Sequence, residues 1–444
     1  MKLLIIDTDG LGLGLAWRAA KWGHEVRWFI QPNGKMSKKI GAGFAGIKRV
    51  DNWLAHAAWA DVIFPTFYDK HYTPRLQKLR ERGAPVFGPS MESAELEVKR
   101  GVGMKLLEKC GVNVPDWKQF PTLAAAEKFV WANPKRWVFK TLGDNEDKSL
   151  SYCAMSAADM IERLRYWERI GLNPKGPVML QEFIEGSEMG ISRWMGAKGW
   201  IGPPQENLEH KKLMTGGYGP NTGEMGTTSQ YVEKSKLFED VLAPIEKELI
   251  RLGHLGDIDL NCIISKDDGK PYVLEFTCRP GWPAYNLMIS QHAGDPIAWK
   301  AAALEGVDKL SAIASKDATV GVVIAGFDFP VSKLAAQETE GVPIFGVTKK
   351  NGAHIHPQYV SIELKADMAG DGVIERPIWV TAGDYLAVVV GQGKTVKQAA
   401  DRAFDIVGEL HVPNMIVRKD VGYCAEDPLT ELHKHGYAKE MRFA

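Results

Sequence analysis

Short apolar segments alternate with amphipathic segments through the first 90 residues, and this alternation constrains the fold more than any other feature. KLLIID (2–7) is a continuous apolar run, GLGLGLAWRAAKWG (10–23) turns through glycines into an amphipathic pattern, and HEVRWFIQ (24–31) is apolar again. ADVIFPTF (60–67) and PVFGPS (85–90) continue the rhythm. Apolar runs bounded by turns are typical of parallel strands buried on both faces. We therefore expect a doubly wound sheet over residues 1–90.

The rest of the chain has a mixed pattern that predicts two further domains. Residues 91–317 contain helical patterns at 92–111, 156–171 and 236–253, and strand patterns at 136–142, 177–184, 188–196, 199–204, 257–265 and 271–278. From residue 318 the strands TVGVVIAGF, VSIELKA and DYLAVVVGQG precede the helix TVKQAADRAFDIVGEL. We expect an α+β domain at 91–317 with a subdomain at about 118–185, and a β-rich domain at 318–444.

Composition excludes several classes of protein. The 444 residues are 45% hydrophobic and 25% charged with a formal net charge of zero, so no bulk positive field draws in nucleic acid. The five cysteines are scattered without a CxxC pair, which favours a reducing cytoplasm over a disulfide framework. The first apolar run is too short for a signal peptide, and no run reaches the length of a membrane span.

Two glycine patterns resemble nucleotide-binding motifs but have the wrong spacing. Gly10, Gly12 and Gly14 do not form GxGxxG, and no acidic residue ends the second strand to hold a ribose. GQGKT (391–395) resembles part of a P-loop, but Val388 stands where the first glycine is required. We interpret GQGKT as a strand-to-helix turn.

Four polar segments follow one another in the middle of the chain. They are VFKTLGDNEDKS with Lys140 and Lys148, LQEFIEGSE (180–188), EHKKLMTGGYGPNTGEMG (209–226) and DIDLNCIISKDDGKPYVLEFTCRPG (257–281). Each alone also fits a plain surface feature: a solvated lysine, a strand end with solvated acids, or an ordinary turn. Glycine is nonetheless costly to order and is kept where the chain turns tightly or approaches a ligand.

Together the four segments contain the residue types that could hold Mg-ATP between two sheets. A lysine pair flanking a loop can clamp phosphates. Asp259, Asn261, Glu275 and Thr277 fall on two adjacent strands, where their oxygens can converge on one face. Arg279 follows, and arginine is a bidentate partner for a carboxylate or phosphate.

The order and the amino-acid sequences of these segments resemble those of the ATP-grasp superfamily. Within it, they more closely resemble the glycinamide ribonucleotide synthetase (phosphoribosylamine–glycine ligase) family. GPNTGEMG is similar to the family's GPNTGGMG, and LEFTCRPG is similar to EFNCRFGDPE. VFGPS with AELE (residues 86–97) and RKDVG (418–422) extend the resemblance over nearly the whole length. It implies an ATP-grasp fold with an N-terminal pre-ATP-grasp domain and a C-terminal β-rich domain.

The resemblance also implies a function in purine biosynthesis: glycine is activated by ATP as an acyl phosphate and is joined to the amine of phosphoribosylamine. The implied ATP-binding residues are Lys140, Lys148, Glu182, Phe183, Ile184 and Glu188. The implied Mg²⁺ (or Mn²⁺) ligands are Glu275, Thr277 and Asn261. The implied substrate-binding residues are His210, Lys211, Gly219, Pro220, Asn221, Thr222, Gly223 and Arg279, of which Asn221, Thr222 and Arg279, with Lys148, are expected to take part in catalysis.

Departures from the family leave alternatives open. DGLGLGLA replaces the family's GGREHA, FPTFYDKHY replaces GPEAPL, Thr277 replaces a metal-binding Asn, and the loop after Lys140 is acidic. The first two segments meet the sugar-phosphate amine in the family. Three hypotheses follow: a divergent glycinamide ribonucleotide synthetase, a ligase joining glycine or another small amino acid to a different amine such as a modified nucleotide or specialised metabolite, and a non-catalytic binding protein. Small-molecule substrates, and a monomer or dimer, are expected.

Overall fold

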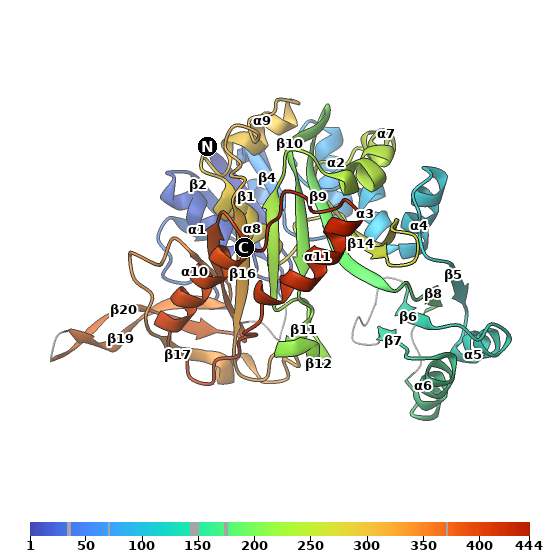
Figure 1. Cartoon of the computed structure of the whole chain (residues 1–444). Helices are drawn as coiled ribbons and strands as arrows, with labels where there is room; N and C mark the ends of the chain where they lie inside the picture. The colour runs from blue at the N-terminus through green and yellow to red at the C-terminus, as the bar shows by residue number, and fades with distance from the viewer. Residues whose placement is uncertain (33–36, 70–71, 143–150, 173–175, 370–371) are drawn as a thin grey trace.

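The N-terminal part of the molecule is a four-stranded parallel sheet. The structure is a computed structural model that describes residues 1–32, 37–69, 72–142, 151–172, 176–369 and 372–444. The sheet order is β3-β2-β1-β4 (Figure 1), with β1 at Lys2–Asp7, β2 at Glu25–Ile30, β3 at Ile47–Arg49 and β4 at Val62–Pro65. The expected alternation is confirmed for β1, α1, β2 and β4. The strand expected in PVFGPS is reduced to an isolated parallel bridge between Val86 and Ile63 of β4.

Helices cover this sheet and lead into the next part of the chain. They are α1 (Leu13–Lys21), the 3-10 helix η1 (Trp53–Trp59), α2 (Thr73–Glu81), α3 (Met91–Val98) and α4 (Arg100–Lys109). The sequence predicted a single helix over 92–111, but the backbone breaks at Lys99. Gly103 allows the close packing at this break, since a Cβ there would lie 2.5 Å from the Leu96 carbonyl oxygen and 2.9 Å from the Phe276 ring.

A small separate sheet lies to the right in Figure 1, with the order β5-β8-β6-β7. Its elements are β5 (Trp117–Phe120), α5 (Leu123–Ala132), β6 (Trp137–Thr141), β7 (Tyr152–Cys153), α6 (Ala157–Arg169) and β8 (Val178–Glu182). The two helices pack on the sheet around a core of their own that includes Val130, Phe139 and Leu164. These elements overlap the subdomain expected at about 118–185, whose bounds stay a prediction.

An eight-stranded sheet forms the centre of the molecule, in the order β15-β14-β9-β10-β13-β16-β21-β18. The strands are β9 (Gly186–Gly196), β10 (Gly199–Glu209), β13 (Gly226–Tyr231), β14 (Gly256–Ser265), β15 (Pro271–Thr277), β16 (Ala318–Ala325), β18 (Ile355–Pro357) and β21 (Tyr385–Gly393). The strands predicted at 188–196, 199–204, 257–265 and 271–278 are confirmed, and they pair as the β9–β10 and β14–β15 hairpins. Strands β13 and β16 pair across the expected boundary at 317/318, and that boundary stays a prediction.

The remaining helices and strands lie around the central sheet or extend from it. They are β11 (Lys212–Met214), η3 (Thr215–Gly217), β12 (Tyr218–Asn221), the π-helix η4 (Phe238–Leu242), η5 (Ala243–Ile245), α7 (Glu246–Arg251), α8 (Ala284–Gln291), α9 (Ala298–Leu304), η6 (Ala336–Thr339), β17 (Glu340–Ile344), β19 (Val360–Ala369), β20 (Gly372–Ala382), α10 (Val396–Glu409), η7 (Tyr423–Ala425) and α11 (Glu426–Lys434). The helix predicted over 236–253 is divided into η4, η5 and α7, and Pro244, which has no backbone N–H to donate, lies in the irregular segment.

GQGKT is a strand-to-helix turn, as the spacing predicted. Strand β21 ends at Gly393 and α10 begins at Val396, with the Thr395 hydroxyl accepting a hydrogen bond from the Gln398 amide at 3.3 Å. Within the described residues, we find no helix with the length and apolar character needed to cross a bilayer.

Candidate functional site

A row of polar side chains follows β14 and β15 at the edge of the central sheet. Asp259 lies opposite Thr277, and Asn261 lies opposite Glu275. Because side chains alternate between the two faces of a strand, all four project to the same face. The convergence predicted from the sequence is therefore present in the geometry, whereas the metal-binding role of these residues stays a prediction.

Cations from two other elements meet Glu275. Arg100, buried at the start of α4, forms an ion pair with Glu275 at 2.6 Å. Lys140 on β6 places its Nζ 3.4 Å from the Leu274 carbonyl oxygen, next to Glu275 in the chain. Burial, together with the nearby Arg100 charge, lowers the pKa of Lys140 to about 7. The small sheet thus brings a lysine to the polar row, while Lys148 and the acidic loop lie outside the described residues.

The segment that joins the two sheets holds the other predicted nucleotide residues. Glu182, at the end of β8, pairs with Lys135 at 3.0 Å, and the Arg136 guanidinium lies 3.4 Å from the centre of the Phe183 ring. Ile184 is half-buried, and Glu188 on β9 pairs with Lys211 at 2.7 Å. Glu188 therefore faces the polar row, whereas Glu182 is engaged with Lys135.

The glycine-rich segment forms a small exposed hairpin beside this row. Strands β11 and β12 pair through Lys212 with Asn221 and through Met214 with Tyr218. Gly216, Gly217 and Gly219 have φ values of 76°, 75° and 80°, a conformation that glycine adopts readily and other residues rarely do. Tyr218–Asn221 is exposed along its whole length, and Gly223 is exposed as well. Pro220 and Asn221 are thus presented to solvent by a tightly turned backbone.

The two basic residues before the hairpin have different surroundings. Lys211 points into the carboxylates, with its Nζ 2.7 Å from Glu188, 3.1 Å from Glu209 and 4.0 Å from Glu275. The Lys211 carbonyl oxygen accepts hydrogen bonds from the Thr222 amide and hydroxyl at 2.8 and 2.9 Å.

His210 is buried instead, with its Nδ1 3.6 Å from the Cys424 Sγ. Burial and the neighbouring Arg418 charge lower the pKa of His210 to about 4, so the ring is neutral at pH 7.

RKDVG holds the hairpin against the central sheet. Arg418 donates to the Lys212 carbonyl oxygen at 3.0 Å and pairs with Asp420 at 2.7 Å. The Asp420 carboxylate accepts from the Gly216 amide at 2.9 Å, and the Lys419 amide donates to the Thr215 hydroxyl at 3.2 Å. Sequence reasoning used RKDVG only as a mark of resemblance and missed this supporting role.

Arg279 lies beyond the end of β15 and is held by α3. Its guanidinium contacts Glu97 at 3.0 and 3.2 Å, and its centre lies 4.1 Å from the centre of the Phe67 ring. The other Glu97 oxygen accepts from the Cys278 amide at 2.8 Å. An anionic ligand at Arg279 would therefore share it with Glu97, which lies in the AELE segment.

A buried carboxylate organises the turn after β1. Asp7 Oδ1 accepts from the amides of Asp9 and Gly10 at 3.1 and 3.0 Å and from the Thr66 hydroxyl at 2.9 Å. Asp7 Oδ2 accepts from the Gly12 amide at 2.7 Å and the Trp28 indole at 3.0 Å. This turn opens a helix at the carboxyl end of a parallel strand, a place where doubly wound folds bind phosphate groups. Here the amides of Gly10 and Gly12 already donate hydrogen bonds to the Asp7 carboxylate.

The donor set fits a hard cation such as Mg²⁺. Asn261 is 4% exposed, and its Oδ1 accepts no hydrogen bond within the described structure. That oxygen faces the same side of the sheet as the Glu275 carboxylate, and Thr277 adds a hydroxyl. No group of three or more His, Cys, Asp or Glu residues is placed to hold a metal ion in the described parts of the chain. Mg²⁺ is commonly held by one or two carboxylates together with substrate phosphates, and a set of one carboxylate (Glu275), one amide oxygen and one hydroxyl fits this kind of coordination.

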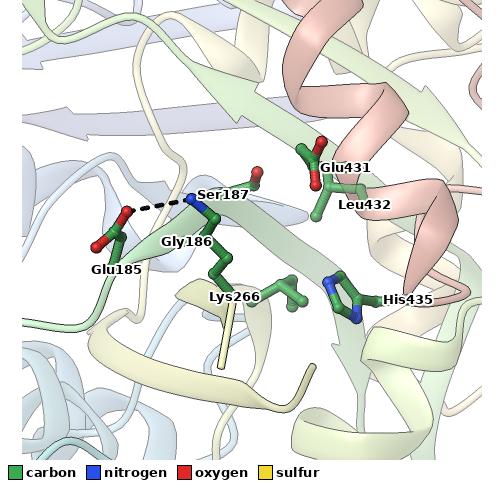
Figure 2. Close-up of a pocket in the computed structure, with 8 residues that line it drawn as sticks. Glu185, Gly186, Ser187, Lys266, Glu431, Leu432 and His435 are labelled. Atoms are coloured by element: carbon green, nitrogen blue, oxygen red, sulfur yellow. Dashed lines mark hydrogen bonds and ion pairs between the residues drawn. The ribbon is translucent and has the colours of Figure 1, made fainter. Parts of the chain in front are cut away.

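A cavity of about 300 Å³ lies on the opposite face of β9 and β14 (Figure 2). Glu185 and Lys266 pair across it at 3.4 Å, and His435 follows α11 on its other side. Ser187 and Ile264 line it, and they alternate with the residues of the polar row. The central sheet therefore separates this cavity from the candidate site.

The small sheet and the central sheet meet at this junction of basic and acidic side chains, an arrangement that fits the ATP-grasp fold. Residues 102–284 match the family model for the phosphoribosylglycinamide synthetase ATP-grasp (A) domain. A solved biotin carboxylase from Campylobacter jejuni has a TM-score of 0.62 at 14% identity, covering 98% of this chain and 97% of that one. The ATP-grasp fold expected from the motifs is confirmed.

The chain is similar in particular to phosphoribosylamine–glycine ligases. The enzyme of Pseudomonas aeruginosa is 22% identical over 443 residues, covering 96% of this chain and 98% of the relative. The solved structure of the Thermotoga maritima enzyme has a TM-score of 0.69 at 22% identity and covers 95% of this chain and 100% of that one. The resemblance seen in the motifs is thereby confirmed along the chain.

Proposed function

We propose that the protein is an ATP-dependent carboxylate–amine ligase that joins glycine to phosphoribosylamine, the activity named for its relatives. The observation that carries the proposal is the meeting of Lys140, Arg100 and Glu275 where the small sheet reaches the central sheet. Phosphate groups, a metal ion and a carboxylate substrate need this mixture of charges in one place.

The reaction proceeds in two steps and needs no nucleophile from the protein. The glycine carboxylate attacks the γ-phosphorus of ATP, and ADP leaves as the acyl phosphate forms. The amine then attacks the acyl carbon, the C–N bond forms, and phosphate leaves while the amine loses a proton. Catalysis is mainly positioning and charge neutralisation.

Each predicted residue has a place in this scheme. Lys140 and Lys148 hold the phosphates, the segment from Glu182 to Ile184 lines the adenine, and Glu188 reaches the ribose. Glu275, Asn261 and Thr277 hold Mg²⁺ or Mn²⁺, which neutralises phosphate charge when bound. Arg279 holds the glycine carboxylate or the acyl phosphate. We assign substrate binding to His210, Lys211 and the hairpin residues 219–223.

The architecture and setting are part of the same proposal. We assign residues 1–90, 91–317 and 318–444 to three domains, with residues 118–185 as a subdomain that closes over ATP. The substrates are small molecules, the protein is a monomer or dimer, and the compartment is the cytoplasm, which agrees with five free cysteines.

The test is ADP release with Mg-ATP, glycine and freshly formed phosphoribosylamine, omitting each component in turn, with mass spectrometry of the product. ADP formation that needs all three, with the mass of glycinamide ribonucleotide, is expected. Absence of ADP formation under every combination contradicts ligase activity with these substrates.

A second candidate is a ligase that joins glycine to an amine without a phosphate at the turn after β1. Asp7 favours it, because its carboxylate already holds the Gly10 and Gly12 amides and repels a second anion. The same experiment separates the candidates. ADP release that depends on glycine but is unchanged by phosphoribosylamine supports the second one.

A further inference from the structure

A group of buried polar residues lies on the central sheet beside the predicted metal ligands. Asn207 and Glu209 come from β10, Asp259 comes from β14, and Glu224 precedes β13; we call these four residues the acidic floor. They are 2%, 20%, 8% and 6% exposed respectively, with the Glu209 value for its side chain. The proposed function as stated above uses none of them.

Gly190 on β9 makes this arrangement possible. The register places Gly190 between Asn207 on one side and Asn261 on the other. Asn207 Nδ2 donates across β9 to Asp259 Oδ2 at 2.8 Å, and Asn261 Nδ2 donates across it to Glu209 Oε2 at 2.8 Å. A Cβ at Gly190 would lie 2.2 Å from Asn207 Oδ1. The missing side chain thus lets the polar groups of β10 and β14 meet.

The acidic floor holds more carboxylate groups than there are cationic side chains beside it. Lys211 contacts Glu188, Glu209 and Glu275, so it is shared among three carboxylates. Neither Glu224 nor Asp259 forms an ion pair with a lysine or arginine in the parts of the chain that the structure describes. Glu224 accepts instead from the Thr227 hydroxyl. Buried carboxylates without a cation are costly, and a bound cation would relieve that cost.

A second observation points to the same kind of ligand. Asn207 Oδ1 has no hydrogen-bond donor within the described structure, although its amide nitrogen is bonded to Asp259. An unsatisfied buried carbonyl oxygen beside carboxylates suits a group that has several donors and a positive charge. A primary ammonium has three N–H donors and no acceptor, and it matches these acceptors.

We propose that the acidic floor binds the ammonium group of the amino-acid substrate; this inference rests on the proposed ligase function. Asp259 lies opposite Thr277, the last residue of β15, and Arg279 follows two residues later in the chain. One small amino acid can meet both, with its carboxylate toward Arg279 and its ammonium toward Asp259 and Glu224. The floor then selects amino acids over other small carboxylates.

The test compares glycine with glycolate, which has a hydroxyl in place of the ammonium, as substrates for ADP release with Mg-ATP. Wild-type protein is expected to prefer glycine on the order of 100-fold in kcat/KM, since a charge pair in a buried site is lost with glycolate. Glu224→Gln and Asp259→Asn are expected to lose at least about 10-fold of that preference, mostly through the glycine KM. An unchanged preference in both variants overturns the proposal.

The matched control is Glu206→Gln. Glu206 is a buried carboxylate on the same strand as Asn207 and Glu209, but it alternates to the other face and accepts from Ser235 at 2.7 Å. It is expected to leave the glycine preference at the wild-type value. Loss of preference in Glu206→Gln as well would show a general structural effect and overturn the specific role of the floor.

A binding measurement separates failure of this inference from failure of the proposed function. Glycinamide, a cation without a carboxylate, is expected to raise the melting temperature of the wild type but not of Glu224→Gln, even if no ligase activity is found. No shift in the wild type overturns the inference. An equal shift with Mg²⁺ alone that also disappears in Glu224→Gln would make the floor a metal site and overturn the ammonium assignment.

Discussion

Glu275 is the residue on which the charges of the candidate site depend. It pairs with Arg100 at 2.6 Å, has Lys211 at 4.0 Å, and lies opposite Asn261. The role of Glu275 as a metal ligand stays a prediction. Arg279, at the other end of the row, instead pairs with Glu97. We assign Arg279 to the anionic group of the substrate.

We expect Glu275→Ala to reduce ATP-dependent ADP release by at least about 100-fold, because positioning of the metal and phosphates is lost. The measurement is steady-state ADP release, with circular dichroism to show that the variant is folded. Turnover equal to the wild type in a folded variant would contradict the role given to Glu275.

We expect Arg279→Ala to raise the KM for glycine by about 10- to 100-fold, the effect of losing a hydrogen bond to a charged group. The KM for ATP is expected to stay within about 3-fold, because the nucleotide residues lie at the other end of the row. A collapse of ATP affinity with a normal glycine KM would assign Arg279 to the nucleotide. Arg193→Ala, which removes a half-buried arginine lying 4.7 Å from the centre of the Phe238 ring, is a control.

The β11–β12 hairpin is the element whose position depends most on contacts distant in sequence. Few hydrogen bonds join its two strands, and its glycines leave it without a side-chain core of its own. Arg418 and Asp420 fix it through the Lys212 carbonyl oxygen and the Gly216 amide. Its local stability is therefore set by a segment near the C-terminus.

We expect Arg418→Ala to lower kcat for ligation about 10-fold and to speed amide hydrogen exchange in residues 212–221, because the hairpin loses its support. The melting temperature should change little by comparison with the exchange rates. Lys419→Ala removes an exposed side chain at the next position and is the control. Unchanged exchange in Arg418→Ala would contradict the supporting role.

The whole molecule is joined by its central sheet. Strand β16 pairs with β13 on one side and β21 on the other, so residues far apart in the sequence complete a single sheet. We expect a chain ending at residue 315 to aggregate, because the edge of β13 would be exposed. The measurement is size-exclusion chromatography of the truncated chain beside the full chain. A soluble, folded monomer would contradict this, because it would show that residues 1–315 fold without residues 318–444.

Global stability should also depend on Glu206. Burial raises the pKa of Glu206 to about 7, above its ordinary value of 4.5. The folded state therefore keeps a proton that the unfolded state has lost between these values, and stability falls as pH rises from 4.5 through 7.

Glu206→Gln removes this pH-dependent loss of stability, because glutamine does not ionise. We expect the variant to be more stable than the wild type by about 2 kcal/mol at pH 8 and to show little difference at pH 4.5. Urea unfolding at both pH values measures it. A stability difference that is independent of pH would contradict the shifted pKa.

Local sequence patterns were sufficient for most elements and for the edge of the candidate site. Alternation along β14 and β15 predicted that Asn261, Glu275 and Thr277 share a face, and glycine content indicated a tight turn in the segment that forms the β11–β12 hairpin. The same local patterns missed the break between α3 and α4 and overestimated PVFGPS as a strand, because packing and pairing decide both.

The sequence by itself determined most of the helices and strands, since periodicity and turn residues act over a few neighbouring positions. Only the tertiary structure decided which distant groups meet: Asn207 with Asp259 across Gly190, Arg418 with the hairpin, and Glu97 with Arg279. These contacts follow from strand order and register, and long-range pairing is not encoded in any local window. The acidic floor is thus visible only once β14, β9 and β10 lie side by side.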